Sequence, residues 1–188
     1  MAAATALTNF GVNAIWAILL VYAVRELGLR AGVIGLVLSL GEIAGLAAAT
    51  LGPRITRARG PGLAIVGAAA LFGPSQLLLA LAPRSAPIPF LVGGWAIGSF
   101  ARVIYNSTAT SLRQAIVPQR LQGRVVGAVR AVAIGLLPLG ALTGGLLAAA
   151  FGLRDAMIAG AVIACLPTLP LLASPLTRLR ELPAQADD

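Results

Sequence analysis

The sequence contains no histidine, and only six of its 188 residues are acidic. The lack of histidine excludes His-based zinc sites, histidine-dependent catalytic triads and histidine-ligated haem. The single cysteine, Cys165, lies in an apolar run, so the sequence predicts neither a disulfide framework nor a cysteine metal cluster. We therefore expect no metal and no cofactor.

Charge is also scarce, because 11% of the residues are charged while 59% are hydrophobic. A soluble domain has about 25% charged residues. Apolar runs that approach the length of about 20 residues needed to cross a bilayer recur along the chain. Short segments with arginine, proline or glycine separate them. This pattern predicts an all-α, polytopic membrane protein in contact with the lipid bilayer.

Six transmembrane helices are predicted within one domain, residues 1–174. Their expected ranges are about residues 3–24, 31–52, 62–82, 88–111, 125–150 and 156–174. Pro74, inside the third span, is expected to kink it. Residues 175–188 form a short polar tail that is expected to be disordered.

An even number of spans places both termini on one side of the membrane. The loops and tail on that side carry eight arginines, and the opposite loops carry four. The positive-inside rule therefore predicts a plasma-membrane protein with both termini in the cytoplasm. The net charge of +8 is interpreted as a topology signal and as contact with lipid headgroups, not as nucleic-acid binding.

Glycines at four-residue spacing predict close contacts between helices. Such pairs let two backbones approach where lipid supplies no hydrophobic drive for helix association. The second and fifth spans are both rich in glycine and both follow a loop with basic residues, which hints at a three-plus-three inverted repeat. The predicted contact pairs are Gly41/Gly45, Gly94/Gly98 and Gly140/Gly144.

Ionisable residues within a span cost a few kcal/mol each on insertion scales, so they mark candidate functional sites. Glu42 lies near the middle of the second span, and Arg102 lies near the middle of the fourth. One interpretation is a buried structural ion pair, or a protonated Glu42. The other is a water-filled cavity that binds a substrate or protons.

Polar side chains recur at three- and four-residue steps along the fourth span and, in part, along the first, which places them on one helix face. Such a stripe either lines a pathway or joins helices by hydrogen bonds. The third and sixth spans show no comparable stripe and, apart from Ser75, Gln76 and Thr168, look lipid-facing. The residues predicted to line a substrate path are Asn9, Asn13, Trp16, Glu42, Trp95, Ser99, Arg102 and Asn106.

The segment between the fourth and fifth spans has a specific pattern. It contains Leu-Arg-Gln-Ala at 112–115, Pro118, and Leu-x-Gly-Arg at 121–124. This segment resembles the cytoplasmic loop between the tenth and eleventh helices of major facilitator superfamily exporters, and most closely those of the macrolide-efflux and enterobactin-exporter type. Residues 138–145 and 152–154 are similar to the eleventh helix and the turn after it. The likeness covers essentially the whole chain and corresponds to the carboxy-terminal half of a family member.

The resemblance implies half of a major facilitator fold that works by alternating access, in which two six-helix halves rock about a midplane site. It implies proton-coupled efflux of small molecules, such as drugs or siderophores, by an antiporter. The first, second, fourth and fifth spans would face the path, and Glu42 is the one acidic residue within a span that could couple protons. The loop arginines that would form a cytoplasmic gate are Arg54, Arg57, Arg59, Arg113, Arg120 and Arg124.

The chain departs from that family in two ways. By this resemblance the family's amino-terminal six helices are not part of the sequence, so the expected partner is such a half or a second copy of the chain. In addition, the basic segment 52–60 lacks the aspartate that the superfamily has in such loops.

The sequence also bears on two other classes of function. A membrane enzyme is disfavoured, because a rhomboid-type protease needs histidine and a lipid phosphotransferase needs clustered aspartates. A non-transporting membrane partner, or an inactive remnant of a transporter, stays open as the alternative.

Overall fold

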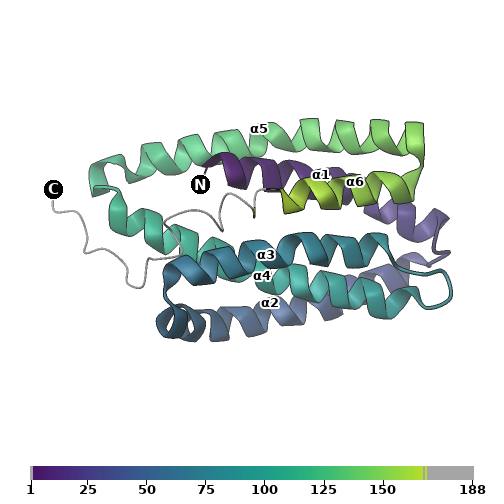
Figure 1. Cartoon of the computed structure of the whole chain (residues 1–188), viewed down its shortest axis with the longest axis horizontal. Coiled ribbons are helices and arrows are strands. Elements are labelled where there is room, and N and C mark those ends of the chain that lie inside the picture. The colour runs from purple at the N-terminus through teal and green to yellow at the C-terminus, as the bar shows by residue number, and fades with distance from the viewer. Residues whose placement is uncertain (1, 167, 169–188) are drawn as a thin grey trace.

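The computed structural model describes residues 2–166 and 168, and within them every regular element is a helix. The prediction of an all-α chain is thus confirmed, and five of the helices, α1 to α5, are long and apolar enough to cross a membrane. The helices in Figure 1 are α1 (Ala2–Arg25), α2 (Ala31–Arg59), α3 (Pro61–Ala80), α4 (Pro87–Ile116), α5 (Gln119–Phe151) and α6 (Leu153–Cys165). Most of the predicted sixth span beyond α6, and the tail 175–188, lie outside the described residues.

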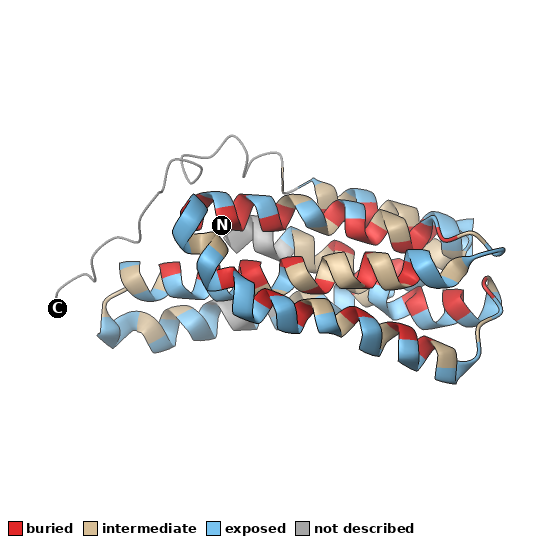
Figure 2. Ribbon diagram, turned by 90° about the horizontal axis from the view of Figure 1, so that it is seen from below, coloured by how far each residue is buried: buried red, intermediate tan, exposed pale blue. Residues whose placement is uncertain are grey.

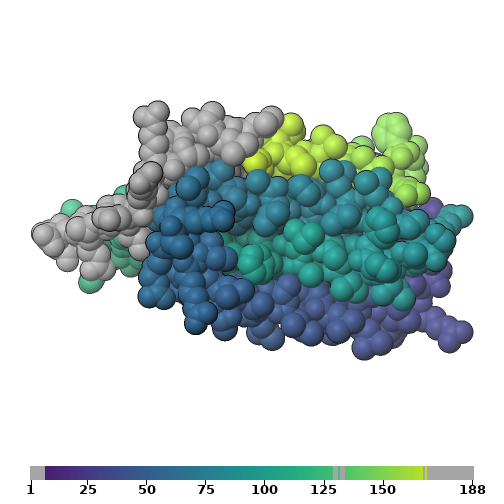
Figure 3. Space-filling view, turned by 60° about the horizontal axis from the view of Figure 1, so that its bottom comes forward, coloured from purple at the N-terminus to yellow at the C-terminus, as the bar shows by residue number. Residues whose placement is uncertain are grey.

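The helices form two layers, one of α1, α5 and α6 and the other of α2, α3 and α4 (Figure 1). Figure 3 shows α6 beside α3, where the two layers meet. α1 packs against α5 and α6, and α4 packs in the same way against α2 and α3. The first helix of each consecutive triplet is therefore exchanged into the other triplet, while α3 and α6 meet between the layers. This exchange is the packing that a three-plus-three inverted repeat produces.

The turn between the second and third helix is the same in both triplets, since each consists of one glycine. Gly60 separates α2 from α3 with φ of 85°, and Gly152 separates α5 from α6 with φ of 96°. A side chain with a β-carbon strongly disfavours these values, whereas glycine adopts them readily. The two glycine N–H groups donate to the carbonyls of Thr56 and Ala148, at 2.9 and 3.0 Å.

The three predicted glycine pairs all lie at helix contacts, so this prediction is confirmed. A β-carbon on Gly41 would collide with the side chain of Trp95 in α4. A β-carbon on Gly94 would lie 2.8 Å from a backbone oxygen of α3, and one on Gly144 would collide with the backbone of Ala14 in α1. The absence of side chains at these positions lets the helices approach closely.

Two predicted loops are helical instead. α2 was expected to end at residue 52, but it continues through Pro53 to Arg59. Proline removes one backbone donor, and membrane helices accommodate that loss. The helix therefore continues to Arg59 and stops before Gly60. Between α4 and α5 only Val117 and Pro118 are not helical. The arginines predicted for gate loops therefore lie on helix ends: Arg54, Arg57 and Arg59 on α2, Arg113 on α4, and Arg120 and Arg124 on α5.

The prediction that the third span faces lipid is wrong. In the most apolar stretch of each helix, 56% of the residues are buried in α3, against 28% in α2 and 11% in α5. In Figure 2 the buried residues gather where the helices face one another. α3 lies between α4 and α6, and its alanines and glycines make it narrow enough for both neighbours to approach. Its mostly apolar sequence is compatible both with burial against protein and with contact with lipid. α6 also buries one face.

Candidate functional site

Glu42 of α2 is the centre of a polar cluster at mid-length of the bundle. Its carboxylate accepts hydrogen bonds from Trp95 Nε1 at 3.2 Å and from Ser99 Oγ at 2.7 Å. Arg102 Nη2 donates to both carboxylate oxygens at 3.0 Å. The three donors lie four and three residues apart, which places them on one face of α4. The structure thus joins two of the ionisable residues that the sequence places inside spans, Glu42 and Arg102.

Glycines on α2 make room for this cluster. Gly41 and Gly45 flank Glu42 on the side of α2 that meets α4. A β-carbon on Gly45 would lie 2.5 Å from Ser99 Oγ and 3.2 Å from a carboxylate oxygen of Glu42. The close approach of α2 and α4 therefore allows the Ser99 hydroxyl to reach the carboxylate.

The cluster is buried on one side and exposed on the other. Trp95 and Ser99 are buried. By contrast, the side chains of Glu42 and Arg102 are 46% and 47% exposed. Asn106, one turn further along α4, is also exposed on the side that carries Arg102. The ion pair is thus presented on an open side of the described chain.

A small cavity of about 40 Å³ adjoins the cluster and is lined by residues from four helices. Trp16 of α1 contacts Trp95, with 4.6 Å between their ring centroids. Gln76 of α3 also lines the cavity and is 5% exposed. Its Oε1 atom is buried without a hydrogen-bond partner among the described residues. The cavity has room for a water or a small polar group, and this oxygen offers it an acceptor.

The structure brings together five of the eight residues predicted for the path: Trp16, Glu42, Trp95, Ser99 and Arg102. Asn9, Asn13 and Asn106 lie outside this cavity.

Asn13 donates to the backbone oxygen of Asn9 at 2.6 Å, and its side chain lies against α5 at Gly140. The sequence identifies Gln76 as a polar exception in an apolar span, but it does not assign this residue to the site.

The two ends of the bundle differ in charge. At one end Arg84 pairs with Glu26 at 2.7 Å, and Asp155 lies near the start of α6. At the other end the six arginines predicted for the gate lie on α2, α4 and α5, and the sequence has no acidic residue between Glu42 and Asp155. A bond of 3.2 Å between the hydroxyls of Thr56 and Thr108 ties α2 to α4 near this end.

The Glu42–Arg102 ion pair is suited to binding a charged ligand or a proton. Within the ranges that the structure describes, no group of three or more histidine, cysteine, aspartate or glutamate residues could hold a metal ion. A carboxylate beside a guanidinium can exchange its partner for a proton or for a charged ligand, and both groups here can be reached from one side.

Residues 1–186 match the family model described as Major Facilitator Superfamily. The match includes all six helices. A comparison with curated proteins gives no match.

Proposed function

This chain belongs to the Major Facilitator Superfamily, a family of membrane transporters, and we propose that it acts as one six-helix half of a proton-coupled exporter. The substrates would be small molecules of the drug or siderophore class. This assignment rests on the similarity of residues 111–124 to the macrolide-efflux and enterobactin-exporter type. By that similarity the chain corresponds to the carboxy-terminal half, in the plasma membrane with cytoplasmic termini.

The open ion pair of Glu42 and Arg102 is the observation that carries the proposal. Both side chains are nearly half exposed near the middle of helices long enough to span the membrane. Ionised groups that face acyl chains are costly, so such residues face the interior of a bundle or a water-filled cavity. The side of the chain that carries the pair would therefore face a wet path in the assembled transporter.

The roles of the lining residues follow from their chemistry. Protonation of Glu42 would weaken its bond to Arg102 and free the guanidinium for a substrate or for bulk water. Trp16 and Trp95 would supply an aromatic wall, and Gln76 an acceptor. Asn9 and Asn13 on α1 and Asn106 on α4 would extend the polar path along these helices. The arginines at the helix ends would form the cytoplasmic gate.

The open side also requires a cover, and we propose that a second six-helix half provides it. α2 and the apolar part of α5 are the least buried spans, and each carries exposed leucines. An amino-terminal half would cover this side and complete the path, and a second copy of the chain is the other candidate. A non-transporting membrane partner is the alternative function, but it leaves the open charged pair without a role.

Reconstitution into proteoliposomes tests the proposal. The full chain would be assayed alone and together with a six-helix amino-terminal half, under an imposed pH gradient, with fluorescent drugs and an iron siderophore as the panel. We expect movement that depends on the gradient, and we expect Arg102→Ala to abolish it, because the variant leaves Glu42 without its exchangeable partner.

The matched control is Arg84→Ala, which breaks the Glu26–Arg84 ion pair at the water-exposed end. This variant should transport like the unmodified chain. If no arrangement of the unmodified chain moves any substrate, the non-transporting alternative replaces the proposal. Equal transport by Arg102→Ala and the unmodified chain would remove the ion pair from the path.

A further inference from the structure

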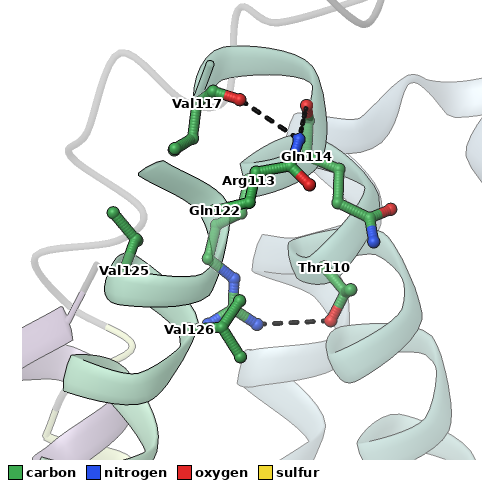
Figure 4. A pocket seen from close by; sticks show the side chains of 7 residues that line it. All are labelled: Thr110, Arg113, Gln114, Val117, Gln122, Val125 and Val126. Atoms are coloured by element: carbon green, nitrogen blue, oxygen red, sulfur yellow. Dashed lines mark hydrogen bonds between the residues drawn. The ribbon is translucent and has the colours of Figure 1, made fainter. Parts of the chain in front are cut away.

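A second cavity lies away from the ion pair, at the corner where α4 ends and α5 begins. Its volume is about 200 Å³, and Figure 4 shows the seven side chains that line it. α4 has 30 residues, which corresponds to a length of about 45 Å. Such a helix reaches from one headgroup layer to the other, so this corner would lie at the level of the lipid headgroups.

Arg113 makes the cavity attractive to an anion. Its Nε donates to the Ala109 carbonyl at 3.1 Å, and its Nη2 donates to Thr110 Oγ1 at 3.2 Å. These two bonds fix the orientation of the guanidinium, which Figure 4 shows between Thr110 and Val126. An arginine side chain has five N–H donors, so further donors are available to bind the oxygens of a phosphate.

The amide of Gln122 covers acceptors that would repel an anion. Its Nε2 donates to the backbone oxygens of Gln114 and Val117, both at 3.2 Å. These carbonyls belong to the end of α4, where the helix dipole is negative. The amide therefore shields this negative end and also ties the first turn of α5 to the last turn of α4 (Figure 4).

The rest of the cavity wall is apolar, and its surroundings are basic. Val125 and Val126 form the wall on α5, and Val126 is an exposed residue. None of the lining residues is acidic. Arg120 and Arg124 lie near the same end of α5, exposed and outside the lining. The cavity thus has a cationic side at Arg113 and an apolar side at Val125 and Val126, at the level of the lipid headgroups. A ligand with a phosphate group attached to an acyl chain is complementary to these two sides.

We propose that this corner binds an anionic phospholipid, with the phosphate on Arg113 and the start of an acyl chain against Val125 and Val126. Basic pockets between transmembrane helices on the cytoplasmic side bind headgroups of this kind. The inference does not depend on transport. An exposed basic surface alone would attract anionic lipid through all its arginines, whereas the cavity assigns binding to one of them.

Lipid binding to the full chain, purified in mild detergent and freed of lipid, tests the inference. Native mass spectrometry would compare phosphatidylglycerol, phosphatidylcholine and inorganic phosphate. We expect phosphatidylglycerol to bind most tightly and Arg113→Ala to weaken it about tenfold, because a charge-assisted contact at the membrane surface is lost. Arg124→Ala removes the same charge from α5 outside the cavity and should change binding by less than about twofold.

A second pair of variants tests the apolar wall without altering charge. Val126→Trp would fill the cavity and should weaken phosphatidylglycerol binding, whereas Val162→Trp, at an exposed position of α6, should not. The inference is overturned if phosphatidylcholine binds as tightly as phosphatidylglycerol. It is also overturned if inorganic phosphate alone reproduces the affinity, or if Arg124→Ala costs as much as Arg113→Ala.

Discussion

At the scale of single residues, the part of the chain that the structure describes contains two Arg–Glu ion pairs in different surroundings. Arg102→Ala is expected to lower the free energy of unfolding in mild detergent by about 1–2 kcal/mol, because the carboxylate of Glu42 loses its cation beside the buried Trp95. Near-half exposure keeps this loss below that of a fully buried pair. The double variant with Glu42→Gln should recover part of it, since no unpaired charge remains. Denaturant unfolding curves measure both changes.

The second ion pair is the matched control. Arg84 and Glu26 have side chains that are 75% and 37% exposed. Water solvates either partner when the other is removed, so Arg84→Ala should change the free energy of unfolding by less than about 0.5 kcal/mol. If Arg84→Ala and Arg102→Ala lower the free energy of unfolding equally, Glu42 is as well solvated as the ion pair at the end of the bundle.

At the scale of the element, alanine substitutions at two adjacent glycines of α5 distinguish the effect of helix packing on stability from the effect of helix propensity. A β-carbon on Gly144 would collide with the backbone of Ala14, whereas one on Gly145 would meet no atom within 4 Å. Gly144→Ala should therefore push α5 from α1 and cost about 1–3 kcal/mol. Gly145→Ala should be neutral or stabilising by up to about 1 kcal/mol, because alanine favours the helix. Thermal unfolding followed by circular dichroism compares the two.

A result in which both alanine variants lose the same stability would contradict this packing. It would mean that α1 and α5 do not cross at Gly144 in the folded protein.

The six helices were predictable from the lengths of the apolar runs, but the residues at which they end were less predictable. The sequence predicts six helices, and the described residues contain six, because each run has to satisfy its backbone internally once it is buried in lipid. Pro53 was taken as a helix end, but a proline stops a helix only where nothing else holds the following turn. The burial of α3 was missed because an alanine-rich surface looks the same whether it meets lipid or another helix.

The site was predictable in part for the same physical reason. A charge in a span is costly, so Glu42 and Arg102 could be identified as candidates from the sequence, and the helical period assigned Trp95 and Ser99 to the same face of α4 as Arg102. Gln76 was not identified as part of the site, because only the position of α3 beside α4 brings its amide to the cavity. Such a contact between helices has no signature in a single sequence.

At the scale of the whole molecule, the unequal charge of the two ends predicts the orientation in the membrane. The end that carries the arginines of α2, α4 and α5 should remain in the cytoplasm, since positively charged segments resist translocation. In a Cys165→Ser background, Ser85→Cys should react with an impermeant maleimide on intact cells, because it lies in the turn beside the Glu26–Arg84 pair. Arg57→Cys and Arg120→Cys, exposed at the opposite end, should react only after permeabilisation. Since all three positions are exposed, the side of the membrane alone accounts for the difference, and the reverse labelling pattern would invert the proposed topology.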